Sequence, residues 1–219
     1  MIPQKFSKKE AIRFGWETMK SNFGFLFLVV IVSLLLGIFQ EVLRIPADLL
    51  KGSPLILLIV LIGVIFWGLQ RIVEMGIIKI VLKFCDNEKP AFSELFSCFH
   101  LFFNYLGGMV LYLLIVVGGI ILLIVPGIIW AIRFQFFGYL IVDKGLGPVA
   151  SLKKSFEITK GSALNLFLFG FLAMGVMLLG VLCLLAGILV AIPIVAVAFG
   201  FVYRKLLPKA EVTVEKVIV

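Results

Sequence analysis

Charged side chains are scarce in this sequence of 219 residues: Asp, Glu, Lys and Arg make up 15% of it, whereas hydrophobic residues make up 63%. A soluble domain carries about a quarter charged residues and about half apolar ones. A water-soluble core of this length cannot hide so much apolar surface, so lipid must form part of the solvent. The shortage of charge therefore excludes a secreted soluble domain and a disordered chain.

The residues of metal, disulfide and acid–base chemistry are equally few. His100 is the single histidine, and the three cysteines, Cys85, Cys98 and Cys183, have no CxxC spacing. These absences exclude a zinc ribbon and a disulfide scaffold, and they predict that no metal is bound. The sequence also has no HExxH motif, G-x-S-x-G elbow, Walker A loop or G-x-G-x-x-G fingerprint. We therefore expect no catalytic residue, no cofactor and no enzymatic activity.

Acidic residues are outnumbered by basic ones, 12 against 20, and the formal net charge is +8. Apart from Arg44, Lys51 and Arg133, every Lys and Arg lies in one of four segments, at 5–20, 71–100, 144–160 and 204–216. Because the cytoplasmic loops of membrane proteins are basic, these segments are predicted to share the cytoplasmic side. This interpretation excludes nucleic acid as the partner. It places the chain in the cytoplasmic membrane of a prokaryote, with both termini in the cytoplasm.

Long uncharged runs are what the sequence has in abundance. They cover residues 21–40, 52–70, 101–142 and 161–203, and Arg133 is the one charge among them. A single span needs about 20 apolar residues, so each of the two longer runs can hold two spans that turn back. Because proline interrupts a helix, Pro126 with Gly127 marks one turn and the stretch 187–193 marks the other. A kinked helix that continues into an interfacial helix is the alternative.

The sequence thus predicts an all-α polytopic membrane protein with one transmembrane domain, residues 1–207, and a cytoplasmic tail, residues 208–219. Its six transmembrane helices are expected at 22–40, 54–71, 104–125, 127–142, 163–185 and 189–206. They pair into three hairpins. An amphipathic helix on the cytoplasmic face is expected before each hairpin, at 7–20, 92–102 and 148–160.

An internal repeat supports three copies of one unit. Residues 12–20 align with residues 152–160: each copy has an apolar residue, a cation, an aromatic residue four positions after the first, then Glu and Lys. A third and weaker copy begins at Phe92. The alignment predicts that the three hairpins with their amphipathic helices are pseudo-repeats.

Local signals mark where two of the amphipathic helices begin. Ser7 and Glu10 have the spacing of a capping box, and Pro148 suits the first turn of a helix. In the first helix, the spacing of Ile12 and Trp16 predicts an apolar face for the membrane surface.

A polar pattern follows the expected turn at Pro126. The run Leu122-Leu123-Ile124-Val125-Pro126-Gly127-Ile128 is followed by Arg133, by Val142-Asp143 and by residues 147–161, and residues 68–96 fit the same pattern. These residues resemble multi-pass prokaryotic membrane proteins similar to the membrane domain attached to some glycerophosphodiester phosphodiesterases. The resemblance implies a link to glycerophospholipid headgroups. It carries over no catalytic residue, because the phosphodiesterase activity of that family resides in a separate soluble domain.

Four residues are candidates for a ligand or a lipid headgroup: Arg133, Arg71, Glu74 and Asp143. Arg133 is predicted to lie within the hydrocarbon, where a charge needs a partner or a wet cavity. It either contacts a lipid phosphate, which guanidinium binds bidentately, or pairs structurally with Glu74 or with backbone carbonyls. Arg71 and Glu74 share a helix face. They belong either to an exposed juxtamembrane helix or to a polar vestibule with Arg133 and Asp143.

The function predicted from these features is non-catalytic. We expect an integral membrane protein that binds or organises lipids, with anionic headgroups as the partner, or that anchors another membrane protein or a second copy of itself. A small transporter or lipid-translocating channel is the alternative, because internal repeats are common in transporters.

Overall fold

The computed structural model describes residues 6–49 and 55–207, and in these residues every regular element is helical. The helices are α1 (Lys8–Ser21), α2 (Phe23–Leu49), α3 (Leu55–Cys85), two short 3₁₀ helices η1 (Phe92–Leu95) and η2 (Phe99–Leu101), α4 (Phe102–Leu122), α5 (Ile124–Phe134), α6 (Phe137–Lys144), α7 (Pro148–Ile158), α8 (Ala163–Leu182) and α9 (Leu184–Leu206). Six helical stretches within this part of the chain are long and apolar enough to cross a membrane. The predicted all-α architecture is therefore confirmed, and the six apolar stretches are compatible with a multi-pass membrane protein.

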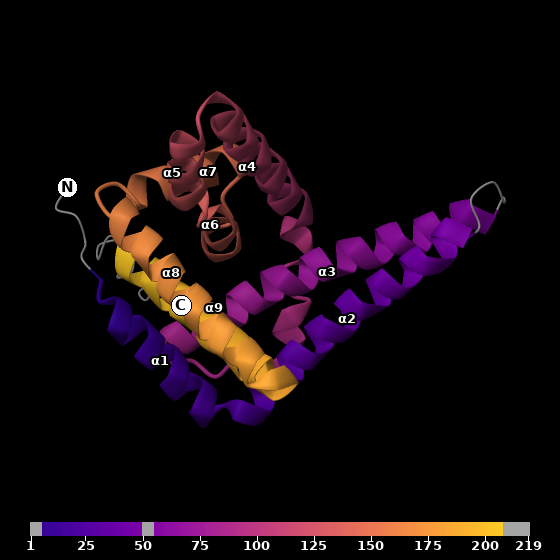
Figure 1. The fold of residues 1–219 in the computed structure, drawn as a ribbon, viewed down its shortest axis with the longest axis horizontal. Coiled ribbons are helices and arrows are strands. Elements are labelled where there is room, and N and C mark those ends of the chain that lie inside the picture. The colour runs from indigo at the N-terminus through magenta and orange to yellow at the C-terminus, as the bar shows by residue number, and fades with distance from the viewer. Residues whose placement is uncertain (1–5, 50–54, 208–219) are drawn as a thin grey trace.

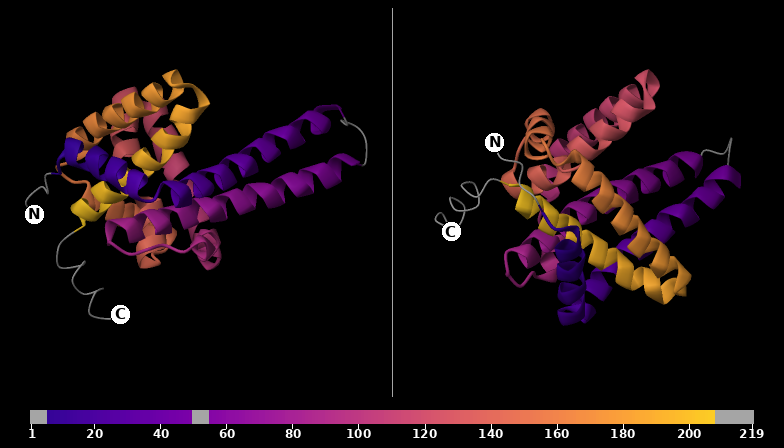
Figure 2. Two further views of the ribbon diagram at one scale, coloured as in Figure 1. Left: turned by 90° about the horizontal axis from the view of Figure 1, so that it is seen from below. Right: turned by 60° about the vertical axis from the view of Figure 1, so that its left-hand side comes forward.

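Three pairs of helices form arms that extend from a common body. Helix α2 packs along α3, α4 along α5, and α8 along α9. Figures 1 and 2 show that the arms point in different directions, and that the α2–α3 arm projects farthest from the body. Helix α1 packs on α9, and α7 packs on α4, α5 and α6. The body is thus the place where segments distant in sequence meet.

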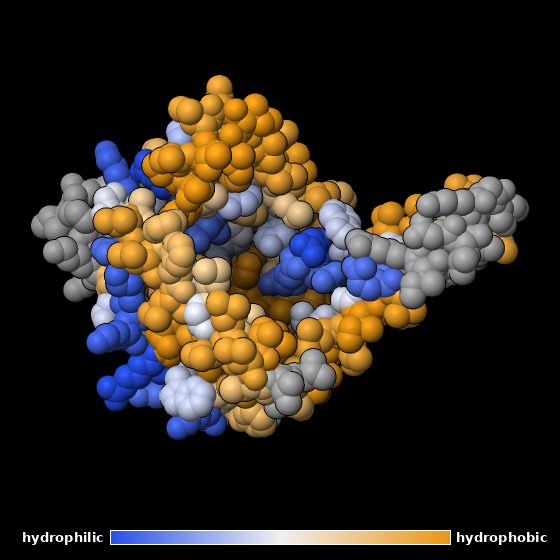
Figure 3. Space-filling view, viewed as in Figure 1, coloured by the Kyte–Doolittle hydropathy of each residue, from blue (hydrophilic) through white to orange (hydrophobic). Residues whose placement is uncertain are grey.

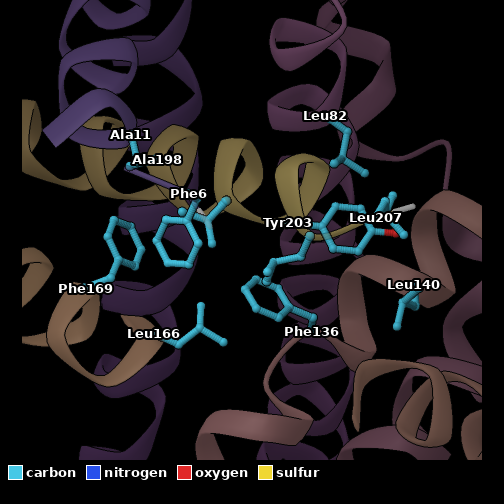
Figure 4. Packing of buried hydrophobic residues seen from close by; sticks show 12 residues of the cluster. Phe6, Ala11, Leu82, Phe136, Leu140, Leu166, Phe169, Ala198, Tyr203 and Leu207 are labelled. Atoms are coloured by element: carbon cyan, nitrogen blue, oxygen red, sulfur yellow. The ribbon is translucent and has the colours of Figure 1, made fainter. Parts of the chain in front are cut away.

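The core of the body is apolar and aromatic. Phe169 of α8 and Tyr203 of α9 are fully buried in one cluster with Phe136, and Phe6 packs edge-on against Phe169. Figure 4 shows these side chains converging between α8, α9 and the start of α6. By contrast, large apolar side chains of the arms are exposed, as a lipid-facing surface requires.

Helix α1 begins as expected, but it packs on a different face. The hydroxyl of Ser7 accepts a hydrogen bond from the backbone N–H of Glu10 at 3.3 Å, which confirms the cap. The face that packs on α9 contains Ala11 and Gly15, while Trp16 remains 43% exposed. A side chain at position 15 would collide with the carbonyl oxygen of Ile194, so glycine is what lets the two backbones approach.

Two helices of the first arm run beyond their predicted limits. Helix α2 continues through Pro46 to Leu49, and α3 continues to Cys85, whereas ends near 40 and 71 were expected. The segment of α3 from Val73 onward is amphipathic and largely buried in the body. The predicted ends were wrong because the charged residues that follow positions 40 and 70 were assigned to loops, whereas they lie in helices.

The turns of the other two arms do not fall at the prolines. They lie at Leu123 and Cys183, so Pro126 is in the first turn of α5 and Pro193 is inside α9. The physical reason for the first shift is that the first turn of a helix tolerates proline, because its N–H groups have no helical partner. The predicted limits 104–125 and 189–206 are accordingly displaced by a few residues.

The amphipathic helix predicted at 92–102 is wrong. The segment forms η1 and η2, separated by a turn, and only its last residue enters α4. Leu95 is fully buried where its backbone touches Gly76 of α3, and Lys79 of α3 donates to the Ser97 hydroxyl at 3.0 Å. These contacts fix the segment against α3 and leave no continuous helix free for the membrane surface.

Candidate functional site

The helix predicted at 127–142 is interrupted in its middle. Helix α5 ends at Phe134 and α6 begins at Phe137, so the backbone around Gln135 leaves the helical hydrogen-bond ladder. The hydroxyl of Ser155, on α7, donates to the carbonyl oxygen of Arg133 at 2.8 Å and accepts from the N–H of Phe136 at 3.2 Å. One side chain of a neighbouring helix thus satisfies both backbone groups that the interruption exposes.

Helix α7 faces the interruption with hydroxyl groups rather than with an apolar face. Ser151, Ser155 and Thr159 recur every four residues and have no exposed surface. The Thr159 hydroxyl lies 2.7 Å from the carbonyl oxygen of Ser155 and 3.1 Å from that of Arg133. The apolar side chain of Leu152 is buried beside this polar face. Polar groups at these depths persist only when they are hydrogen-bonded, as they are here.

The side chain of Arg133 is held by the same helix. Its guanidinium donates to the backbone carbonyl of Phe156 at 3.1 Å and lies over the Phe156 ring, 3.3 Å from its centroid. The Nε atom is buried without a hydrogen-bond partner, although the residue as a whole is partly exposed. Arg133 therefore retains donors that α7 does not use.

The predicted pairing of Arg133 with Glu74 is wrong. Glu74 pairs with Arg71 at 2.8 Å within α3, which is the neighbour that their spacing indicated. The alternative partner for Arg133, a backbone carbonyl, is the one observed. No described carboxylate forms a salt bridge with Arg133, in contrast to the arginines at 13, 71 and 204.

Asp143 belongs to a separate cluster of charges in the body. Its side chain is 4% exposed and lies 2.8 Å from Arg204, and the Tyr203 hydroxyl donates to it at 2.8 Å. Arg204 also contacts Asp86 at 2.6 Å, so one guanidinium joins the ends of α3, α6 and α9. The predicted vestibule therefore does not bring Asp143 to Arg133. The role of Arg204 was missed because its partners lie 61 and 118 residues away.

Some basic residues in this structure are paired with a carboxylate, and others are exposed and can bind an anion. Arg13 on α1 is bonded to Glu17 at 2.7 Å, and this hydrogen bond and the Glu17 charge raise the pKa of the Arg13 guanidinium. Lys83 is neutralised by Glu94. By contrast, Lys153 on α7 and Lys160 just after it are exposed. These two lysines are thus open to an anionic ligand.

The body is hollowed between the arms. Figure 3 shows hydrophilic residues inside this hollow, surrounded by the apolar surfaces of the α4–α5 and α8–α9 arms. A small, almost wholly apolar cavity of about 60 Å³ lies elsewhere, between α2, α3 and α9 beside Pro193. Within residues 6–49 and 55–207, no group of three His, Cys, Asp or Glu side chains is placed to hold a metal ion.

Comparison with known proteins finds relatives without an assigned activity. The chain is 30% identical over 132 residues to the uncharacterized proteins Mb2590 of Mycobacterium bovis and Rv2560 of Mycobacterium tuberculosis. The match covers 60% of this chain and 40% of each relative, so the chain spans less than half the length of these proteins. No protein family matches the chain, and no solved structure matches it. The resemblance to glycerophosphodiester phosphodiesterase membrane domains stays a prediction.

Proposed function

We propose that this chain is a non-catalytic integral membrane protein that binds anionic glycerophospholipid through Arg133. The observation that carries the proposal is the state of the Arg133 side chain. It is fixed by one carbonyl and one aromatic ring of α7, and it has no carboxylate partner among the described residues. A guanidinium held in one orientation with unused donors suits the two oxygens of a phosphate.

The surroundings support a lipid rather than a soluble anion. Arg133 lies in a helical stretch apolar enough to span a membrane, and the exposed Lys153 on α7 and Lys160 just after it add positive charge. Lipid headgroups meet the protein at the boundary between apolar arms and basic segments, which is where acidic phospholipids are attracted. The sequence resemblance to the membrane domain of glycerophosphodiester phosphodiesterases points to the same class of lipid.

The orientation belongs to the proposal. We place the basic segments and both termini in the cytoplasm of a prokaryotic cell, because positively charged loops remain inside. The repeat is also part of it: α1 precedes the α2–α3 arm and α7 precedes the α8–α9 arm, in the order that the aligned residues 12–20 and 152–160 predict. The segment before α4 does not follow this pattern.

A small transporter or lipid translocator is the second candidate. The hollow with hydrophilic residues in Figure 3 favours it, and so does the interruption between α5 and α6, because discontinuous helices line transport sites. Transport requires that the bound lipid exchange between leaflets. A fluorescent phosphatidylglycerol becoming accessible to dithionite faster in proteoliposomes than in protein-free vesicles would support transport over simple binding.

Native mass spectrometry tests the binding site. Wild-type protein purified from vesicles of phosphatidylglycerol and phosphatidylcholine should retain phosphatidylglycerol, and Arg133→Leu should lose it. Arg133→Lys should restore retention only in part, because Lys keeps the charge without the fork of donors. Arg13→Leu is the matched control, since Arg13 is exposed and already paired with Glu17. Equal phosphatidylglycerol retention by wild type and Arg133→Leu contradicts the proposal.

A further inference from the structure

One arm is longer than the other two. The sequence toward its end is charged, whereas the sequence at the ends of the two shorter arms is not. Helices α2 and α3 have 27 and 31 residues, or about 40 and 46 Å of helix. Helices α4 and α8 have 21 and 20 residues, or about 31 and 30 Å. In the sequence, residues 41–51 contain Glu41, Arg44, Asp48 and Lys51, whereas residues 106–132 and 163–203 contain no charge.

The tips of the two short arms are apolar and exposed. Leu122, Leu123 and Ile124 at the α4–α5 turn are 73%, 66% and 68% exposed, and Leu182 beside Cys183 at the α8–α9 turn is 78% exposed. The apolar surface of the α4–α5 tip is visible at the top of Figure 3. Side chains of this kind are unfavourable in water and favourable among acyl chains.

Some of the backbone donors at the α4–α5 tip are hydrogen-bonded within the turn. The N–H of Leu123 bonds to the carbonyl of Gly119 at 2.9 Å, and that of Gly127 bonds to the carbonyl of Leu123 at 3.2 Å. Pro126, between them, has no N–H to satisfy. At the other tip, the N–H of Cys183 bonds to the carbonyl of Leu179 at 3.0 Å. These hydrogen bonds lower the cost of placing the turns in hydrocarbon.

The directions of the arms limit how deep their tips reach. A helix of about 30 Å equals the thickness of the hydrocarbon only when it stands along the membrane normal. The arms diverge from one body in Figures 1 and 2, so they cannot all stand along the normal. A tilted short arm ends inside the membrane, while the long arm can be tilted and still cross.

We propose that the α4–α5 and α8–α9 arms enter from the basic side and turn among the acyl chains of the far leaflet. The α2–α3 arm alone then reaches the far aqueous phase. The two exposed apolar tips are surfaces for lipid hydrocarbon rather than for water or a protein partner. This placement rests on the membrane location and not on the headgroup site at Arg133. It keeps both termini on one side, because each arm returns to the side that it left.

The native Cys183 provides the test. Cells and inverted vesicles are treated with a membrane-impermeant maleimide, using a chain that keeps Cys183 but carries Cys85→Ser and Cys98→Ala. Two matched variants have Cys183→Ser in addition and a new cysteine, Asp48→Cys in one and Lys89→Cys in the other. Asp48→Cys should react only from outside and Lys89→Cys only from inside. Cys183 should react from neither side until detergent is added.

A spin label on Cys183 measures how deep the α8–α9 tip lies in the membrane. The relaxation rate of the label should be raised by oxygen, which concentrates in hydrocarbon, and not by a water-soluble nickel chelate. Reaction of Cys183 from outside at the rate of Asp48→Cys, or relaxation by the nickel chelate, overturns the proposal. A reversed pattern for Asp48→Cys and Lys89→Cys overturns the proposed orientation alone, because the prediction that Cys183 is silent from both sides is independent of it.

Discussion

The hydroxyl of Ser155 donates a hydrogen bond to the backbone carbonyl oxygen of Arg133 at 2.8 Å, at the point where the helix is interrupted. The hydroxyl oxygen of Ser155 also accepts a hydrogen bond from the backbone N–H of Phe136. A side chain 22 residues away in sequence therefore stabilises the interruption that positions the Arg133 guanidinium. The proposed headgroup site therefore lies beside an interruption that Ser155 stabilises.

Ser155→Ala should lower the free energy of unfolding by about 1–3 kcal/mol, because it leaves a buried N–H and a buried carbonyl without partners. Thermal unfolding in detergent measures the effect. Ser151→Ala is the control, since Ser151 is equally buried but bonds only to the carbonyl of Pro148 in its own helix. A loss no larger for Ser155→Ala than for Ser151→Ala contradicts this role.

The charges at the ends of α3, α6 and α9 predict an order of stabilities. Arg204→Leu should destabilise most, by about 3–5 kcal/mol, because it strands both Asp143 and Asp86. Asp143→Asn should cost less, since Arg204 keeps Asp86, and Asp86→Asn should cost least because Asp86 is the more exposed carboxylate. Denaturant or thermal melts of the three variants give the order, and a larger effect of Asp86→Asn than of Arg204→Leu would be inconsistent with it.

Helix α1 should detach from α9 when Gly15 is replaced by a residue with a side chain. Gly15→Ala places a methyl group against the Ile194 carbonyl, which cannot move without shifting the α9 backbone, and should cost about 1–3 kcal/mol. Gly24→Ala is matched in chemistry, lies in α2 and meets no atom within 4 Å, so it should be neutral or stabilising. Limited proteolysis near the N-terminus, faster in Gly15→Ala than in Gly24→Ala, reports the detachment. Equal rates exclude a role for this contact.

Local patterns in the sequence were sufficient to predict the features that depend on residues close together along the chain. The Ser7 cap, the first turn at Pro148 and the Arg71–Glu74 pair follow from spacings of three or four residues, and each is present. The apolar runs were also sufficient to predict the number of helical stretches that are long and apolar enough to cross a membrane. These features need no knowledge of tertiary contacts.

Features that depend on distant partners were not predictable in this way. The contact of Arg204 with Asp143 joins residues 61 positions apart, and α7 meets the α5–α6 interruption only after the chain has turned back. One signal was present nevertheless. Ser151, Ser155 and Thr159 recur every four residues on a helix that was expected to be amphipathic, and a hydroxyl face of this kind indicates a buried backbone partner.

The measurement that tests the headgroup site most directly is the change in unfolding temperature on adding lipid to protein in detergent. Because a ligand stabilises only the state that binds it, phosphatidylglycerol should raise the unfolding temperature of the wild type, and phosphatidylcholine should have a smaller effect. Arg133→Leu should unfold cooperatively without added lipid and show no greater rise with phosphatidylglycerol than with phosphatidylcholine. A rise with phosphatidylglycerol as large in Arg133→Leu as in the wild type would contradict a site built on Arg133.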